Sequence, residues 1–158
     1  MDISEIWPPF ALHLQSDDME LSPVREADIP ELAEIARGGV RRDGIEAFLV
    51  NWDSGTDEQV ARSLAQYHWS TRANLTADEW TIEFTDRVNG RAIGIEGVNG
   101  HRFPLTRTVD GDRSVVGQNG TVLTEHHMAL HTEDYVHTGR DLQVTGADAF
   151  RTFLTIAT

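Results

Sequence analysis

A two-residue turn between two segments of alternating apolar and polar residues constrains the fold more than any other feature of this sequence. The turn is Asn89-Gly90, and the segments are residues 80–84 and 91–98. Asn and Gly tolerate the positive φ angles of the tight turns that join antiparallel strands. The pattern therefore predicts a β-hairpin.

Two helices are predicted before this hairpin. The first covers residues 28–37 and opens with a capping-box pair, Asp28 and Glu31. The second opens with the same kind of pair, Thr56 and Gln59, and continues at helical spacing. The apolar positions at this spacing are Ile29, Leu32, Ile35 and Ala36 in the first helix and Val60, Leu64 and Tyr67 in the second.

The order of the predicted elements defines a fold class. A first strand is predicted at residues 19–24, where Pro23 indicates an edge or a strand end. The order strand, helix, helix, strand, strand predicts an α+β, or mixed α/β, arrangement in one domain of 158 residues. From residue 106 onward the apolar residues are sparse and lack a period until residues 150–156. The C-terminal third is therefore predicted to be incomplete or poorly ordered.

Composition narrows the function classes. The formal net charge is −13, which disfavours binding to nucleic acid and favours a cationic amine ligand. The chain has no cysteine, and its basic residues are all arginine, so disulfides, thiolate metal sites and Schiff-base lysines are excluded. No segment is apolar enough to span a bilayer, and the acidic N-terminal segment lacks a signal-peptide pattern. These features predict a cytoplasmic protein without membrane contact.

Several segments, in order, resemble a bacterial branch of the GNAT superfamily of N-acyltransferases, similar to the ribosomal-protein N-terminal acetyltransferases. The resemblance covers about residues 7–105. The segments that carry it are Trp-Pro-Pro-Phe at 7–10, Val-Arg-Glu-Ala-Asp-Ile-Pro-Glu-Leu at 24–32, Gln-Tyr-His-Trp at 66–69 and Trp-Thr-Ile-Glu-Phe at 80–84.

The resemblance implies a single GNAT-like domain with a mixed, V-shaped sheet flanked by helices. Residues 1–105 would form its N-terminal half and residues 106–158 a degenerate or truncated C-terminal half. The implied reaction transfers an acetyl group from acetyl-CoA to an amine of a peptide or small molecule. A carboxylate accepts the amine proton, a backbone N–H polarises the thioester, and a tyrosine or other donor protonates the leaving thiolate.

The family places the CoA pyrophosphate on a glycine-rich turn that opens a helix. The segment most similar to that turn consists of Gly117, Gln118, Asn119, Gly120 and Thr121. It lacks the second glycine of the family turn, and a simple Asn-Gly turn is the alternative interpretation. The departure from the pattern is explained either by a divergent or degenerate member or by a shift of reading frame near residues 107–112.

Carboxylates and aromatic residues supply the other candidates for the site. Glu83 and Glu96 lie on the hairpin strands, where a family member can carry its general base; Glu96 is slightly preferred, and solvent exposure is the alternative for Glu83. Trp52, Tyr67, His68 and Trp69 are candidates to line the acceptor pocket, or else to fill the core.

Two alternatives to an active enzyme remain. The first is a non-catalytic acidic α+β domain that binds a ligand or partner. The second is a metal-binding tail in a stretch that contains His126, His127, His131 and His137. His127 and His131 have the i, i+4 spacing of one helix face, and with Glu125 or His137 they would bind zinc or nickel. The alternative interpretation of this stretch is an unstructured histidine-rich tail. An incomplete sheet would also expose an edge strand, which makes a homodimer a further expectation.

Overall fold

The computed structural model describes residues 1–40, 52–101, 113–116, 120, 122–125 and 141–154. The strands are β1 (His13–Ser16), β2 (Met19–Pro23), β3 (Glu79–Val88), β4 (Arg91–His101), β5 (Arg113–Val116), β6 (Val122–Glu125) and β7 (Gln143–Thr145). The helices are α1 (Ile3–Ile6), α2 (Ile29–Arg37), α3 (Asp57–Ala73) and α4 (Ala147–Phe153), with a 3-10 helix η1 (Pro8–Ala11).

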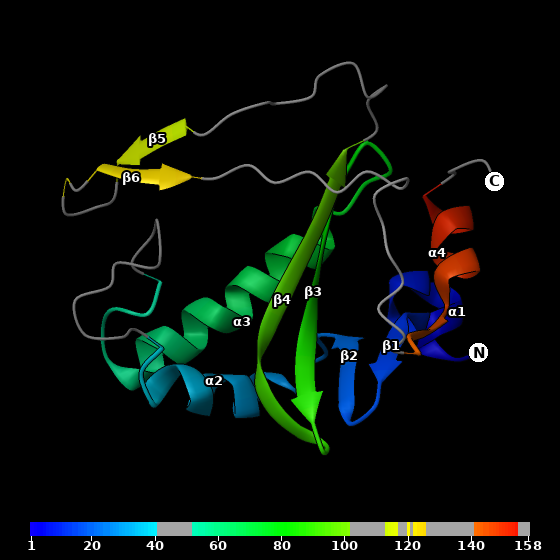
Figure 1. The fold of residues 1–158 in the computed structure, drawn as a ribbon, viewed down its shortest axis with the longest axis horizontal. Coiled ribbons are helices and arrows are strands. Elements are labelled where there is room, and N and C mark those ends of the chain that lie inside the picture. Colours follow the sequence, from blue (N-terminus) through cyan, green and yellow to red (C-terminus); the bar gives the residue numbers. More distant parts are fainter. Residues whose placement is uncertain (41–51, 102–112, 117–119, 121, 126–140, 155–158) are drawn as a thin grey trace.

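Five strands form one sheet in the order β4-β3-β2-β1-β7, and β5 with β6 forms a separate two-stranded sheet (Figure 1). The α+β class predicted from the sequence is confirmed. The expectation of a mixed sheet is wrong for the described strands, because every pair among them is antiparallel. Tight turns account for two of these pairs, because they join β1 to β2 and β3 to β4.

The N-terminal strand is a hairpin rather than the single strand predicted at residues 19–24. A turn at Asp17 and Asp18 connects β1 to β2, and Asp17 takes a positive φ of 53°. Two aspartates in sequence are a weaker indication of a turn than Asn-Gly, which explains why β1 was not predicted. Pro23 is the last residue of β2, so the prediction of a strand end is confirmed.

The hairpin of β3 and β4 forms as predicted. Asn89 and Gly90 both have positive φ angles, 51° and 76°, and Val88 pairs with Arg91 across the turn. The register then shifts, since Arg87 pairs with Ala92 and Asp86 pairs with Gly94. The residue left out of this pairing is Ile93, which forms a β-bulge.

Of the two predicted capping boxes, only the second forms. Thr56 and Gln59 bond reciprocally at the start of α3. At the start of α2, the Asp28 side chain makes no cap bond and instead accepts from the backbone N–H of Arg25 at 2.8 Å. Asp28 and Glu31 both bind Arg87 of β3, at 2.7 and 2.8 Å. The attraction of a half-buried guanidinium thus replaces the capping box predicted from spacing.

The described residues contain a hydrophobic core on each side of the sheet. Helices α2 and α3 cover one side, and their core consists of Val24, Leu32, Ala36, Val60, Leu64 and Ala92. The other core is built on β1, β2 and β3 and contains Leu12, Ile82 and Phe84, with Leu14, Leu21, Leu75, Trp80 and Phe150 packed against it. The strand β3 therefore lies between two packed layers.

The described residues of α4 and Leu154 belong to this second layer. The Phe150 ring of α4 meets the Trp80 ring edge-on at 5.5 Å, and Phe153 meets Trp7 at 5.3 Å. Leu154 is only 1% exposed. The sequence predicts no element here, although the apolar residues at 150–156 are a local indication of one. Strand β7 and helix α4 form part of the domain, and Figure 1 shows α4 beside the N-terminal helices.

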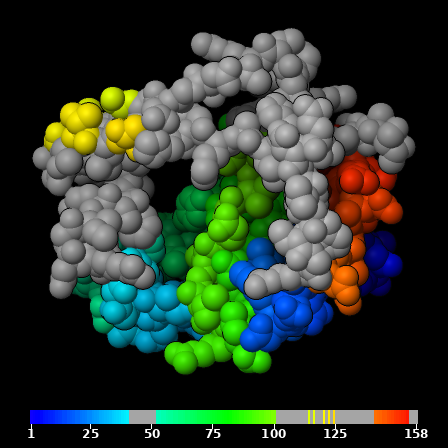
Figure 2. All heavy atoms as spheres, viewed as in Figure 1, coloured from blue at the N-terminus to red at the C-terminus, as the bar shows by residue number. Residues whose placement is uncertain are grey.

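Strand β4 is one of the two edge strands of the described five-stranded sheet, and β7 is the other. The lower part of β4 is visible at the surface between α2 and the N-terminal strands (Figure 2). Ile93, Ile95 and Val98 of this strand are at least one-third exposed. The described sheet thus has an edge at the strand that carries Glu96.

Candidate functional site

A cavity of about 300 Å³ lies between α3 and the hairpin of β3 and β4. Its described lining residues are Trp52, Ser63, Leu64, Tyr67, His68, Glu83 and Ile95. Helix α3 supplies residues from one face, because positions three and four apart share a face of a helix. Glu83 and Ile95 reach the cavity from the sheet, since alternate residues of a strand point to the same side.

Glu83 is the acidic group of this cavity. The phenol of Tyr67 donates a hydrogen bond of 2.5 Å to its Oε1 atom. Gly97 is directly opposite Glu83 in the sheet, and a Cβ placed on this glycine would lie 3.0 Å from the Oε2 atom. The carboxylate therefore lies over the bare backbone of Gly97, with one oxygen fixed by the Tyr67 hydroxyl.

The Tyr67 hydroxyl keeps its proton. Partial burial, followed by the hydrogen bond to Glu83 and the negative charge of that carboxylate, raises the pKa of Tyr67 to about 12. Ionising this phenol would place a second negative charge beside the first. Tyr67 is therefore a donor to Glu83 throughout the physiological pH range.

His68 is a buried, neutral histidine at the base of the cavity. The residue is only 3% exposed, and its Nε2 atom has no hydrogen-bond partner among the described residues. Burial, and then the positive charge of Arg72, lowers the pKa of His68 to about 4, against a smaller opposing effect of Asp28. The imidazole is uncharged at neutral pH, and its Nε2 atom is one polar group that a ligand would satisfy.

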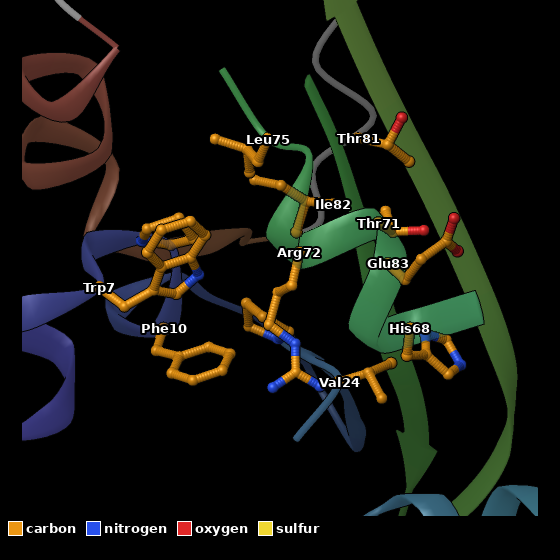
Figure 3. Close-up of a pocket in the computed structure, with 12 residues that line it drawn as sticks. Trp7, Phe10, Val24, His68, Thr71, Arg72, Leu75, Thr81, Ile82 and Glu83 are labelled. Carbon is orange, nitrogen blue, oxygen red and sulfur yellow. The ribbon is translucent and has the colours of Figure 1, made fainter. Parts of the chain in front are cut away.

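A second, smaller cavity adjoins the first and shares His68 and Glu83 with it (Figure 3). Its volume is about 30 Å³, enough for one or two water molecules. The Arg72 side chain extends toward Phe10 in this view, with its guanidinium carbon 5.5 Å from the ring centre. Arg72 also binds Glu26 at 2.6 Å. This region joins α3 to the N-terminal segment.

The structure brings together four of the predicted site residues and separates two others from them. The four that line the same cavity are Trp52, Tyr67, His68 and Glu83. Trp69 is 51% exposed and lines a shallow depression with Trp7 and Arg72 instead. The hydrogen bond from Arg72, and to a smaller extent one from Trp69, lowers the pKa of Glu26.

Glu96, the preferred carboxylate at the sequence level, lies on the other face of the hairpin. It pairs with Phe84, so its side chain shares the face of Ile82 and Phe84 and is exposed. Burial, and then the charge of Glu96, raises the pKa of Asp86 on that same face. The two predicted carboxylates therefore point to opposite sides of the sheet, and only Glu83 faces the cavity.

Most of the predicted CoA-binding turn lies outside the described residues, namely Gly117, Gln118, Asn119 and Thr121. Gly120 is described; it has a positive φ of 80°, and no atom of the described residues lies within 4 Å of a Cβ placed on it. The positive φ fits an Asn-Gly turn and a phosphate-binding turn equally. His126, His127, His131 and His137 also lie outside the described residues.

Sequence reasoning missed Ser63, Ile95 and Gly97. Ser63 falls four residues before Tyr67 on α3, so the helical pattern contained the information needed to place it. Ile95 and Gly97 are brought to the cavity by the β-bulge at Ile93, and no local pattern in the sequence predicts that bulge.

No family model matches this sequence. Within the part of the chain that the structure describes, no helix has the length and apolar composition needed to cross a membrane. No cluster of three or more His, Asp or Glu side chains suited to a metal ion occurs among these residues either.

Proposed function

We propose that this chain is a GNAT-like N-acyltransferase that transfers an acetyl group from acetyl-CoA to an amine bound in the cavity between α3 and the β3–β4 hairpin. One observation carries the proposal: a carboxylate, Glu83, lies at the wall of a mainly apolar cavity with one oxygen fixed by Tyr67. Such a carboxylate has the placement needed to accept a proton from a bound amine. The segments at 7–10, 24–32, 66–69 and 80–84 support the family assignment by resemblance.

In the proposed reaction, the amine nitrogen forms a bond to the thioester carbonyl carbon and the carbon–sulfur bond breaks. Glu83 accepts the proton that the nitrogen loses, directly or through a water molecule, and the leaving CoA thiolate takes up a proton from water and departs as the free thiol. The hydroxyl of Tyr67 holds the carboxylate in place, and the neutral imidazole of His68 adds no competing positive charge to the cavity. Acetyl-CoA is the acyl donor, and the residues proposed to hold its pyrophosphate are Gly117, Gln118, Asn119, Gly120 and Thr121.

Glu83 replaces Glu96 as the proposed general base. Removing a general base typically lowers a rate by about 10²- to 10⁴-fold. We expect Glu83→Gln to lower thiol release from acetyl-CoA by about this factor and Glu96→Gln to leave it nearly unchanged. The two substitutions make a matched pair, because both remove one carboxylate from the same hairpin on opposite faces.

Thermal unfolding with and without acetyl-CoA tests the proposal independently of the acceptor. A ligand present at 100 times its dissociation constant stabilises the protein by about 2.7 kcal/mol. We expect the unfolding temperature to rise at millimolar acetyl-CoA. No rise, together with no thiol release in the presence of an amine mixture, would contradict the acyltransferase proposal.

A non-catalytic ligand-binding domain is the second candidate. The observation in its favour is that the cavity is formed by described residues of α3 and the hairpin, independently of the turn proposed to bind CoA. This candidate predicts stabilisation by an amine without any effect of acetyl-CoA. The same thermal measurement therefore separates the two functions.

A further inference from the structure

The dimensions of the cavity limit the acceptor. Its volume of about 300 Å³ is about ten times that of the adjoining smaller cavity, which is about 30 Å³. The larger volume lies at the lower end of the range of roughly 300–1,000 Å³ for small-molecule sites. A small ligand fits this space, whereas several residues of a peptide do not.

The walls of the cavity favour an apolar body. Trp52, Leu64 and Ile95 contribute apolar surface from three separate parts of the chain, namely the segment before α3, α3 itself and β4. Among the described lining residues, the polar groups are the hydroxyl of Ser63, the pair of Tyr67 and Glu83, the imidazole of His68 and the indole N–H of Trp52. A peptide backbone would bring amides that need partners at each residue, and an unsatisfied buried amide costs about 1–3 kcal/mol.

The charge in the cavity favours a single cationic or amino group. Glu83 is the only acidic side chain among the described lining residues. Tyr67 remains protonated and His68 remains neutral at pH 7, so neither neutralises this carboxylate. The formal charge of −13 on the chain attracts cations toward it from a distance. The Oε2 atom of Glu83, lying over Gly97, is the position for the ligand nitrogen.

We infer that the acceptor is a small primary monoamine with an apolar, preferably aromatic, body, and not the N-terminus of a peptide. The role of this amine as the acyl acceptor rests on the proposed function. Its binding in the cavity does not, because binding needs no acyl donor. The ammonium group binds Glu83, and the body of the ligand fills the space between Trp52, Leu64 and Ile95. The substrate class is thereby narrowed from any amine to amines that fit the volume of the cavity and carry a single positive charge.

Binding of 2-phenylethylamine to the full chain, measured by calorimetric titration without acetyl-CoA, tests the inference. Two isosteric probes serve as comparisons: 2-phenylethanol, which is uncharged, and phenylacetate, which is anionic. We expect the amine to bind roughly ten- to a hundredfold more tightly than the alcohol, as a hydrogen bond to a charged group implies. Equal binding of amine and alcohol would overturn the inference, as would tighter binding of phenylacetate.

A matched pair of variants assigns the binding to the carboxylate. Glu83→Gln is expected to reduce the affinity for 2-phenylethylamine roughly tenfold or more and to leave that for 2-phenylethanol unchanged. Glu96→Gln, on the other face of the hairpin, is expected to leave both unchanged. Equal losses in the two variants would contradict a site at Glu83. Should Glu83→Gln fail to fold, the comparison of amine and alcohol on the natural chain still decides the question.

The inference and the proposed function fail in different ways. Tight binding of 2-phenylethylamine without thiol release from acetyl-CoA would reject the acyltransferase and leave the amine site standing. Thiol release with a tripeptide that has a free N-terminus, but none with 2-phenylethylamine, would reject the small-amine inference and leave the acyltransferase standing. Ethylamine, which has the charge without the aromatic body, is expected to bind more weakly than 2-phenylethylamine, and equal affinities would overturn the role given to the apolar walls.

Discussion

The Tyr67 hydroxyl donates a 2.5 Å hydrogen bond to the Glu83 carboxylate across the cavity between α3 and β3. The hydrogen bond joins α3 to β3, the two elements between which the cavity lies, and its two residues are 16 positions apart in the sequence. Their contact fixes a side chain that would otherwise rotate freely at the end of its stem. The orientation of Glu83, and with it the proposed chemistry, therefore depends on a residue that does not itself react.

A double-mutant cycle of Tyr67→Phe and Glu83→Ala measures this dependence, because each substitution removes one partner of the hydrogen bond. Hydrogen bonds to a charged group contribute about 1.5–3 kcal/mol, and the half-exposed position of Tyr67 places this one near the lower limit. We expect a coupling energy of about 1.5 kcal/mol from chemical denaturation. Additive effects of the two substitutions would show that the pair does not form in solution.

Gly97→Ala and Gly94→Ala test whether bare backbone is needed beneath the Glu83 carboxylate. A Cβ on Gly97 would lie 3.0 and 3.1 Å from the two carboxylate oxygens, so the side chain must move away. A Cβ on Gly94, in the same strand, meets nothing within 4 Å. We expect only Gly97→Ala to weaken the binding of 2-phenylethylamine, by several-fold in a calorimetric titration. Equal effects of the two alanines would indicate a general response of the strand.

Local sequence patterns were sufficient to predict the hairpin but not which carboxylate it presents. The turn at Asn89-Gly90 fixes the pairing of its nearest residues, and counting outward without interruption would place Glu96 opposite Glu83. The bulge at Ile93 shifts the register by one residue, and a shift of one reverses the face of every later side chain. Glu96 therefore faces away from the cavity, and Gly97 takes its place.

Long-range pairing accounts for the other failure of prediction. Strand β7 pairs with β1 more than a hundred residues earlier in the chain, for example Val144 with Leu14. Its three residues are all exposed and show no alternation of burial. Such a strand is defined by its partner and not by its own composition. By contrast, α3 was predictable, because its capping box and its apolar spacing are both local.

The stability of the protein is expected to fall in mild acid because of His68. Its pKa is about 4 in the folded protein, lowered by burial and by Arg72, against 6.5 for the free side chain. Below pH 6.5 the unfolded chain binds a proton that the folded protein excludes, so stability declines toward pH 4 and levels off there. The expected loss is of order 3 kcal/mol at most.

Urea denaturation at several pH values, compared between the natural chain and His68→Gln, isolates this effect from that of the carboxylates. The difference in unfolding free energy between the two should be constant above pH 6.5. It should change in favour of the variant as the pH falls toward 4. A difference independent of pH would mean that the imidazole is accessible to solvent.

Arg87→Gln is expected to destabilise the protein by about 2 kcal/mol. Its guanidinium binds Asp28 and Glu31 at 2.7 and 2.8 Å, and the Asp28 side chain is only 15% exposed. The expected value lies between the 0–1 kcal/mol of surface pairs and the 3–5 kcal/mol lost when one partner of a buried pair is removed. Arg151→Gln provides the control, because its pair with Asp148 is longer, at 3.7 Å, and solvent-exposed. Thermal unfolding of both variants measures the difference. Equal destabilisation of the two would contradict the prediction.

Gly146→Ala tests whether the C-terminal corner belongs to the folded domain. Gly146 has a φ of 78°, and a Cβ there would lie 2.1 Å from the carbonyl oxygen of Ala11. Gly90 has nearly the same φ, 76°, with nothing within 4 Å of a Cβ, so Gly90→Ala isolates the cost of the backbone conformation alone, about 1–2 kcal/mol. We expect Gly146→Ala to cost clearly more in urea denaturation, because the backbone of η1 must move as well. Equal costs would mean that the corner between β7 and α4 does not contact η1, and the second core would then lack the layer that Phe150 supplies.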